Sequence, residues 1–288
     1  MSKIQATVSK ILTFSCVDGP GNRLVIFLQG CNFNCLNCHN PHTINLCDHC
    51  AECVAVCPEK ALSMHGQQVH WQASLCTECD ACIEVCPRNS TPKTKQYSVD
   101  EMMALIRTHS PFLSGITVTG GEATLQLPFI VALFTALKQD VSTQHLTCMV
   151  DSNGSLSRHG WQKLLPVIDG AMIDLKAWQK ETHLRLTNRE NSKVIQTIQL
   201  LEQNHKLYEV RLLLIPNQTD LQTEVDALAQ FLTKRGADVR IKINAFQQHG
   251  VTGEAEQWPS CSEESVKQFA AQLEQRGVNN LILPNVYL

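Results

Sequence analysis

The segment Cys31-Asn-Phe-Asn-Cys35-Leu-Asn-Cys38 opens a cysteine-rich region that extends to Cys86. Two quartets follow it, each directly before a proline: Cys47-x2-Cys50-x2-Cys53-x3-Cys57 and Cys76-x2-Cys79-x2-Cys82-x3-Cys86. Together the three groups hold eleven of the fourteen cysteines. A quartet with this spacing is the ligand run of a bacterial ferredoxin cluster. Three ligands are one too few for a four-iron cluster, so the triplet predicts a cluster with one iron open to a ligand that is not protein.

The two quartets predict crossed ligation, since the fourth cysteine of such a run serves the other cluster. One cluster would be held by Cys47, Cys50, Cys53 and Cys86, and the other by Cys76, Cys79, Cys82 and Cys57. Zinc is an alternative, but structural zinc sites typically use two separated cysteine pairs. Disulfides are another, but they suit small secreted domains. Cys148 and Cys261 stand alone, and we expect them to be packing thiols.

Composition limits the possible partners. The chain has 288 residues, enough for one large domain or for a domain with a module. Its formal net charge is −3, with no basic run, so nothing favours nucleic acid or a membrane surface as a partner. The first residues show no apolar signal region, and no apolar run is long enough to span a bilayer. We therefore expect a cytoplasmic protein with reduced thiols.

Outside the cysteines, short β-branched runs alternate with helical patterns, which predicts parallel strands joined by crossover helices. The expected strands are 24–28, 115–119, 146–150, 170–175, 209–215, 239–245 and 280–283. The expected helices are 102–109, behind a capping box at Ser98 and Glu101, and 127–138, 191–204, 221–235 and 263–276. This order indicates a full or partial (β/α) barrel built from residues 1–44 and 89–288. Residues 45–88 would be an inserted ferredoxin-like domain with two clusters.

In such a barrel, reactive groups follow the carboxyl ends of the strands. Polar segments follow or end five of the expected strands. The triplet, Thr119-Gly120-Gly121-Glu122, Asp151-Ser152-Asn153-Gly154 and Phe246-Gln247-Gln248-His249-Gly250 follow a strand, and Asp174-Leu175-Lys176 ends the fourth. Each is a common turn by itself, but together they predict one functional rim. Strand alternation places Met172, Asp174 and Lys176 on one side. Arg211, inside an apolar strand, should pair with a carboxylate in a polar interior, unless that strand is a wet edge.

Several motifs together identify a family resemblance. They are the triplet with His39-Asn40-Pro41, Asp18-Gly19-Pro20-Gly21-x-Arg23, Phe27-x-Gln29-Gly30 and Thr119-Gly-Gly-Glu122. They resemble those of radical S-adenosylmethionine enzymes, and more narrowly those of the activating enzymes of glycyl radical enzymes. The quartets are similar to those of activases with an inserted two-cluster module, the YjjW-type members above all. The resemblance runs from about residue 8 to the C-terminus.

The resemblance implies roles for residues at the predicted rim. Cys31, Cys35 and Cys38 would hold the catalytic cluster, whose open iron binds the amino and carboxylate groups of S-adenosylmethionine. Residues near that cosubstrate would be Gly120, Gly121 and Glu122 at its amino group, Asn37 and His39 near its adenine, and Lys176 and Arg211 at its carboxylate or ribose. Asp151, Ser152, Met172 and Asp174 match a monovalent cation site beside the cosubstrate, and Asn153 lies in the same loop. Asp18 would belong to the loop that receives the partner's glycine-bearing segment.

The implied activity is the activation of a partner protein. Reductive cleavage of S-adenosylmethionine would give a 5′-deoxyadenosyl radical, which abstracts an α-hydrogen from one glycine of a glycyl radical enzyme. The inserted clusters would relay electrons from a donor such as flavodoxin or ferredoxin, or would have a structural role. Two rival functions stay open: a radical enzyme that acts directly on another peptide or small molecule, and a ferredoxin-type electron carrier. The barrel and the triplet weigh against the carrier.

Two positions depart from the family pattern. Many relatives have a histidine after the sixth strand, where this chain has Gln247, with His249 two positions later. We therefore assign no catalytic histidine. Ala123 follows Glu122 where proline is frequent, and at a turn this change should matter little.

Overall fold

The computed structural model describes residues 4–284 and shows an α/β protein. Its contacts divide the chain into two compact units. The first runs to Asn32 and resumes from Asn40 to Leu146, and the second comprises Phe33–His39 and the chain from Thr147 onward. The cysteine triplet crosses this division, since Cys31 belongs to the first unit and the other two cysteines to the second. No helix in residues 4–284 is both long and apolar enough to span a bilayer.

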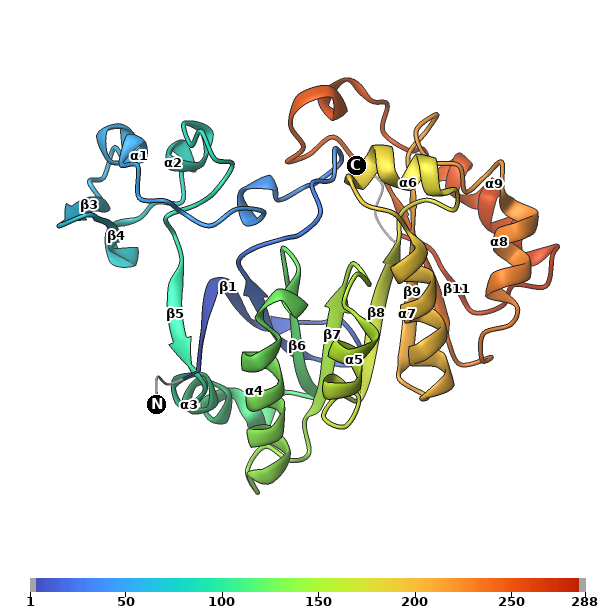
Figure 1. Ribbon diagram of the computed structural model, residues 1–288, viewed down its shortest axis with the longest axis horizontal. Coiled ribbons are helices and arrows are strands. Elements are labelled where there is room, and N and C mark those ends of the chain that lie inside the picture. The colour runs from blue at the N-terminus through green and yellow to red at the C-terminus, as the bar shows by residue number, and fades with distance from the viewer. Residues whose placement is uncertain (1–3, 285–288) are drawn as a thin grey trace. The chain divides into compact units, whose positions relative to one another are not determined.

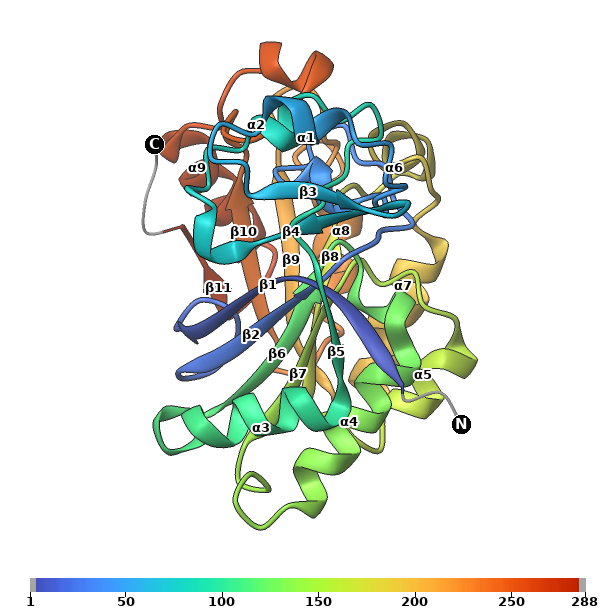
Figure 2. The same ribbon diagram turned by 90° about the vertical axis from the view of Figure 1, so that its left-hand side faces the viewer.

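In the described part of the first unit, four strands are hydrogen-bonded in the order β6-β2-β1-β5 (Figure 2). They are β1 (Gln5–Ser15), β2 (Arg23–Leu28), β5 (Lys95–Ser98) and β6 (Gly115–Gly120). β2 and β6 run parallel, while β1 is antiparallel to both of its neighbours. The expected strands 24–28 and 115–119 are confirmed. β1 and β5 were not predicted, because their partly exposed residues mix polar and apolar types without strict alternation.

The helices of the first unit begin where the sequence indicates. In α3 (Val99–His109), Ser98 Oγ accepts a hydrogen bond from Glu101 N at 3.3 Å, and Glu101 Oε2 accepts one from Ser98 N at 2.8 Å. This confirms the capping box. α4 (Leu127–Gln139) matches the expected helix and packs beside α3 (Figure 1). The short helices η3 (Ser110–Phe112) and η4 (Ala123–Gln126) precede β6 and α4.

The cysteine-rich part of the first unit holds short elements. They are η1 (Pro41–Thr43), α1 (Glu52–Val56), β3 (Leu62–His65), β4 (Gln68–Trp71), η2 (Ala73–Leu75) and α2 (Ala81–Glu84). β3 and β4 form an antiparallel hairpin, and α1 contacts α2. Cys53 and Cys82, one from each quartet, are buried with Leu62 and Val69 in a core of their own. This core lets a short segment with few apolar residues fold around its cysteines.

The described strands of the second unit form a parallel series in the order β11-β10-β9-β8-β7. They are β7 (Thr147–Ser152), β8 (Gly170–Leu175), β9 (Leu207–Leu214), β10 (Arg240–Ala245) and β11 (Leu281–Ile282), each close to an expected strand. Because these strands are parallel, the segments after Ser152, Leu175 and Ala245 leave the sheet at the same edge. In this unit, the polar segments after these strands therefore lie at one edge, as expected.

Helices connect the strands of the second unit. They are α5 (Arg158–Leu164), α6 (Lys180–Thr187), α7 (Ser192–Gln203), α8 (Val225–Leu232) and α9 (Glu263–Glu274), with η5 (Gly253–Gln257) before α9. The expected helices 191–204 and 263–276 are confirmed, and 221–235 is shorter than expected. α5 and α6 were not predicted. Cys148 and Cys261 are buried, as expected of packing thiols, whereas Cys16, which no sequence motif includes, is exposed.

Candidate functional site

The Gly120-Gly121-Glu122 turn packs directly on the backbone that leads to Cys31. Glu122 N donates a hydrogen bond to Gly30 O at 2.7 Å. Gly120 has a φ of +128°, and a Cβ atom there would lie 2.1 Å from Leu28 O. A Cβ atom on Gly121 would lie 2.4 Å from Gly30 O. Only glycine fits at these two positions, which explains the Gly-Gly pair in physical terms.

Glu122 is buried, with 1% of its surface exposed. Its Oε1 atom accepts a hydrogen bond from Thr124 N at 3.0 Å and another from the Thr124 hydroxyl. These bonds fix the orientation of the carboxylate, whose oxygens can only accept hydrogen bonds when it is ionised.

In the second unit, the loop with Cys35 and Cys38 is held by the end of α6. Asn34 N donates to Thr187 O at 3.1 Å, and Leu36 N donates to Leu186 O at 2.9 Å. The helix α6, which the sequence pattern does not predict, therefore positions the loop of two of the three cysteines. Asn37 in the same loop is 5% exposed, and its Oδ1 atom is buried without a hydrogen-bond partner within the described residues. A buried amide oxygen of this kind is costly unless a ligand donates to it.

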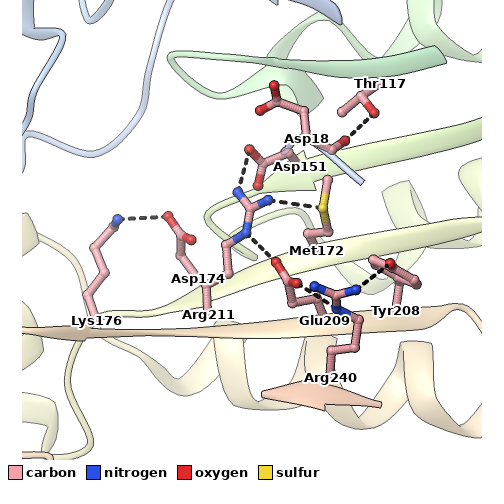
Figure 3. A network of polar contacts seen from close by, with 10 residues as sticks. All are labelled: Asp18, Thr117, Asp151, Met172, Asp174, Lys176, Tyr208, Glu209, Arg211 and Arg240. Carbon is pink, nitrogen blue, oxygen red and sulfur yellow. Dashed lines mark hydrogen bonds and ion pairs between the residues drawn. The ribbon is translucent and has the colours of Figure 1, made fainter. Parts of the chain in front are cut away.

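Lys176 directly follows β8 and lies under the electrostatic influence of Cys35 and Cys38. Its Nζ atom forms an ion pair with Asp174 Oδ2 at 2.8 Å (Figure 3). Burial alone would lower the pKa of Lys176, but the charges of Asp174, Cys35 and Cys38 outweigh it and raise the pKa above its usual value. Burial would raise the pKa of Asp174, but Lys176, Arg211 and Lys242 together hold it below the usual value. Both side chains are therefore charged near neutral pH.

Arg211 lies among carboxylates, as its isolated position in an apolar strand predicts (Figure 3). Its Nη1 atom is 3.0 Å from Asp151 Oδ2, and its Nε atom is 2.7 Å from Glu209 Oε1. Its Nη2 atom donates to Met172 Sδ at 3.0 Å. Burial alone would lower the pKa of Arg211, but Asp151, Asp174 and Glu209 raise it. The alternative, a strand at an open edge with a solvated face, does not hold, because only 12% of the Arg211 side chain is exposed.

Glu209 and Arg240 extend this network and were not among the predicted site residues. Arg240 Nε lies 3.1 Å from Glu209 Oε2, and Arg240 Nη1 donates to the Tyr208 hydroxyl at 3.1 Å. The alternation that placed Arg211 inward also places Glu209 inward, two residues earlier. The sequence therefore indicated that Glu209 faces inward, but only the strand register shows which cationic side chains it pairs with.

The turn after β10 packs on His39. A Cβ atom on Gly250, whose φ is +76°, would lie 2.5 Å from His39 O. Burial lowers the pKa of the His39 imidazole below 6.5, the charges of Lys176 and His249 lower it further, and a hydrogen bond with the Gln247 backbone partly opposes them. His39 is therefore neutral at pH 7. The segment in which this chain departs from the family pattern does reach the cysteine loop.

Ser152 and Asn153 are buried in the turn after β7. Ser152 Oγ accepts a hydrogen bond from Gly154 N at 3.0 Å, and Asn153 Oδ1 accepts one from Ser155 N at 2.9 Å. Both side chains thus shape this turn. In the first unit, the Asp18 carboxylate accepts a hydrogen bond from the Ser15 hydroxyl at 2.5 Å, and Asp18 O accepts one from Thr117 Oγ1 at 2.6 Å. The Asp18 loop is therefore tied to β6.

Cysteines of both quartets lie close together in residues 45–88. One cavity is lined by the predicted second set, Cys57, Cys76, Cys79 and Cys82. For the first set, burial raises the pKa of Cys47, and Cys86 and Cys50 are among the charges that raise it further. Burial, followed by the charge of Cys47, raises the pKa of the Cys53 thiol to about 11. Such a thiol ionises at neutral pH only when a cation binds it.

The two quartets also share one backbone conformation. Three pairs of residues at equivalent positions have left-handed φ values: His49 and Glu78, Ala51 and Asp80, and Lys60 and Asn89. This conformation costs roughly 1–2 kcal/mol for a residue with a side chain. It recurs where the chain bends around each group of cysteines, which points to a shared ligand geometry. In residues 4–284, no group of three or more His, Cys, Asp or Glu side chains has the placement for a single metal ion.

Comparisons with known proteins agree with these features. Residues 25–232 match the model of the Radical SAM superfamily. A putative glycyl-radical enzyme activating enzyme of Haemophilus influenzae is 28% identical over 98% of both chains. A pyruvate formate-lyase-activating enzyme of Staphylococcus aureus is 26% identical over 86% of this chain and 84% of its own. The crystal structure of QueE from Escherichia coli has a TM-score of 0.51 at 13% identity, covers 97% of this chain and 94% of its own, and shows likeness in fold. Since the superfamily model matches most of the sequence, the chain belongs to the radical SAM superfamily.

Proposed function

We propose that this protein is the activating enzyme of a glycyl radical enzyme. Two relatives align along most of the chain. One is named as a glycyl-radical enzyme activating enzyme, and the other as a pyruvate formate-lyase-activating enzyme. The structural observation that carries the proposal is the placement of Lys176, which is mostly buried, pairs with Asp174 at 2.8 Å and lies under the electrostatic influence of both Cys35 and Cys38. A cationic side chain beside a three-cysteine cluster is suited to the carboxylate of a cosubstrate bound at the open iron.

A four-iron cluster on Cys31, Cys35 and Cys38, with S-adenosylmethionine bound, would supply the electron that yields methionine and the 5′-deoxyadenosyl radical. The protein's own residues bind and orient the cosubstrate. The buried Glu122 carboxylate accepts from its amino group, and Lys176 donates to its carboxylate. The unpartnered Asn37 oxygen and the neutral His39 ring suit an uncharged adenine. Glu122 and Asn37 are buried, which helps to keep water from a radical that would react with most organic molecules.

The remaining cosubstrate assignments have less direct support. The Gly120–Gly121 backbone would lie close to the amino group, since neither glycine has a side chain to block the approach. The part of the site beside the ribose and carboxylate of the cosubstrate would be formed by Asp151, Ser152, Asn153, Asp174 and Arg211. Asp18 would belong to the loop that receives the partner's glycine segment.

We propose that residues 45–88 are an inserted domain with two further clusters, as in YjjW-type activases. Asn45 Nδ2 donates to Arg88 O at 2.8 Å, and Ser90 Oγ donates to Asn45 O at 2.7 Å, so the entry and exit of this segment are tied together. The cavity with Cys57, Cys76, Cys79 and Cys82 supports the crossed ligation. These clusters would pass electrons from flavodoxin or ferredoxin, both cytoplasmic carriers, to the catalytic cluster.

Replacing Cys57 with alanine tests this electron path. The anaerobic wild type should hold about twelve irons per chain, the content of three four-iron clusters. The Cys57→Ala protein should lose iron from the cluster of the second quartet, because Cys57 lines that cavity. It should still bind S-adenosylmethionine, turn over poorly with flavodoxin, and recover in part with dithionite.

Two outcomes of this experiment would contradict the relay. Undiminished turnover with flavodoxin would show that this cluster is not an obligatory electron path. A total of about four irons with zinc in the remaining sites would show that the quartets do not hold clusters.

The requirement for a partner tests the proposed activity. Formation of 5′-deoxyadenosine, measured chromatographically, should become productive only when a glycyl radical enzyme is added. Equal turnover without that protein would favour direct action on another peptide or small molecule. A suitable partner is a large protein with a C-terminal glycine-radical motif, encoded beside this chain.

A further inference from the structure

The carboxylates expected to hold a monovalent cation already have a cationic partner. Among the expected ligands, Asp151 and Met172 contact the Arg211 guanidinium at 3.0 Å each, and Asp174 lies within its electrostatic reach. These residues therefore do not fit a free cation. We propose that the Arg211 guanidinium is a built-in counter-ion that replaces a free monovalent cation beside the cosubstrate, and that Glu209 is the positioning residue that holds it there. The inference rests on the proposed cosubstrate site.

Strand register creates this arrangement. Asp151 is paired with Met172, Met172 with Glu209, and Glu209 with Arg240 across β7, β8, β9 and β10. The next row of the same face pairs Asp174 with Arg211 and Arg211 with Lys242. Side chains of paired residues in a parallel sheet point to the same face. The guanidinium therefore reaches back from the second row to the carboxylates of the first.

The charges of this face balance without a free ion. Three carboxylates, those of Asp151, Asp174 and Glu209, are matched by the cationic groups of Lys176, Arg211 and Arg240. Lys242 adds a further positive influence on Asp174. A free cation entering this site would meet no uncompensated negative charge. If Arg211 is removed, Asp151 and Glu209 lose a shared partner, and the local charge falls by one.

Glu209 fixes the orientation of Arg211. It is 3% exposed, and its two carboxylate oxygens bind different arginines, Arg211 through Oε1 and Arg240 through Oε2. Glu209 holds the guanidinium by Nε, while one terminal nitrogen contacts Asp151 and the other contacts Met172. A guanidinium has five N–H donors, and these three contacts use three of them. The other two can meet the cosubstrate, so Arg211 can act as counter-ion and ligand together.

The test compares potassium chloride with tetramethylammonium chloride at equal ionic strength, using the anaerobic holoenzyme. Two quantities are measured: the thermal midpoint without cosubstrate, and the dissociation constant of S-adenosylmethionine by calorimetry. For the wild type, exchanging potassium for tetramethylammonium should change that constant less than about twofold. For Arg211→Gln, potassium should tighten binding about tenfold or more, the scale of one charge-assisted interaction, and should raise the thermal midpoint.

Further variants separate charge from packing. Arg235→Gln removes another mostly buried arginine, paired with Glu202 at 3.6 Å, and should respond to potassium no more than the wild type. Arg211→Lys keeps the charge and should also show no potassium response. The double variant Asp151→Asn with Arg211→Gln removes one charge of each sign and should lose the response of the single variant.

Two outcomes would overturn the inference. One is a wild type that needs potassium for tight cosubstrate binding, a result that does not depend on whether any variant folds. The other is a folded Arg211→Gln protein without a potassium response in either measurement. Loss of cosubstrate binding in all proteins, Arg235→Gln included, would count against the proposed cosubstrate site. The thermal midpoint needs no cosubstrate, and therefore tests the counter-ion separately.

Discussion

The Cys35→Ala protein should form no 5′-deoxyadenosine above background after dithionite reduction. Cys35 is one of three proposed ligands, and with two cysteines a four-iron cluster that must also leave one iron open cannot be held in its catalytic form. Iron content should fall from about twelve to about eight per chain, because the two quartets share no ligand with the triplet. Chromatography of the nucleoside product and an iron assay on the same sample measure both effects.

Cys148→Ala is the matched control for this variant. Cys148 lies in the same unit, is fully buried, and belongs to no cysteine group. Its replacement removes one thiol and should cost some stability without loss of iron or product. Wild-type product from Cys35→Ala would refute the assignment of the triplet. Loss of all iron from that variant would instead mean that the quartets depend on the triplet for assembly.

The cysteine motifs could be predicted because their ligand spacing is local in sequence. A quartet followed by proline specifies its bends within a dozen residues, and the structure repeats these bends at equivalent positions, such as Ala51 and Asp80. The Gly120–Gly121 turn could also be predicted, because its motif is local in sequence. The sequence does not show why glycine is required there. The atoms that a Cβ atom would clash with belong to Leu28 and Gly30, which are distant in sequence.

The polar network could be predicted only in part. Alternation placed Arg211 on an inward face and required a carboxylate partner, and both expectations are confirmed by the ion pair with Asp151. Glu209 was missed because its partners Arg211 and Arg240 become neighbours only through the register of β9 and β10. Single-strand patterns do not contain that register.

The sequence also did not predict that α6 supports the cysteine loop. α6 was not predicted, since most of its residues are polar or charged and its apolar positions are few. Its last residues, Leu186 and Thr187, nevertheless accept the hydrogen bonds that hold the loop of Cys35. Tertiary contacts override weak local patterns at such positions.

In the proposed reaction, the deoxyadenosyl radical takes a hydrogen atom from one glycine of a partner protein. The most direct test uses a partner whose glycine residues carry deuterium at the α-carbon, incubated anaerobically with this protein, S-adenosylmethionine and a reductant. We predict one deuterium in the recovered 5′-deoxyadenosine and a radical on the partner that is detected by electron paramagnetic resonance. Replacing the partner's target glycine with alanine should abolish both signals. Unlabelled 5′-deoxyadenosine at the full rate, with no radical on the partner, would contradict the account.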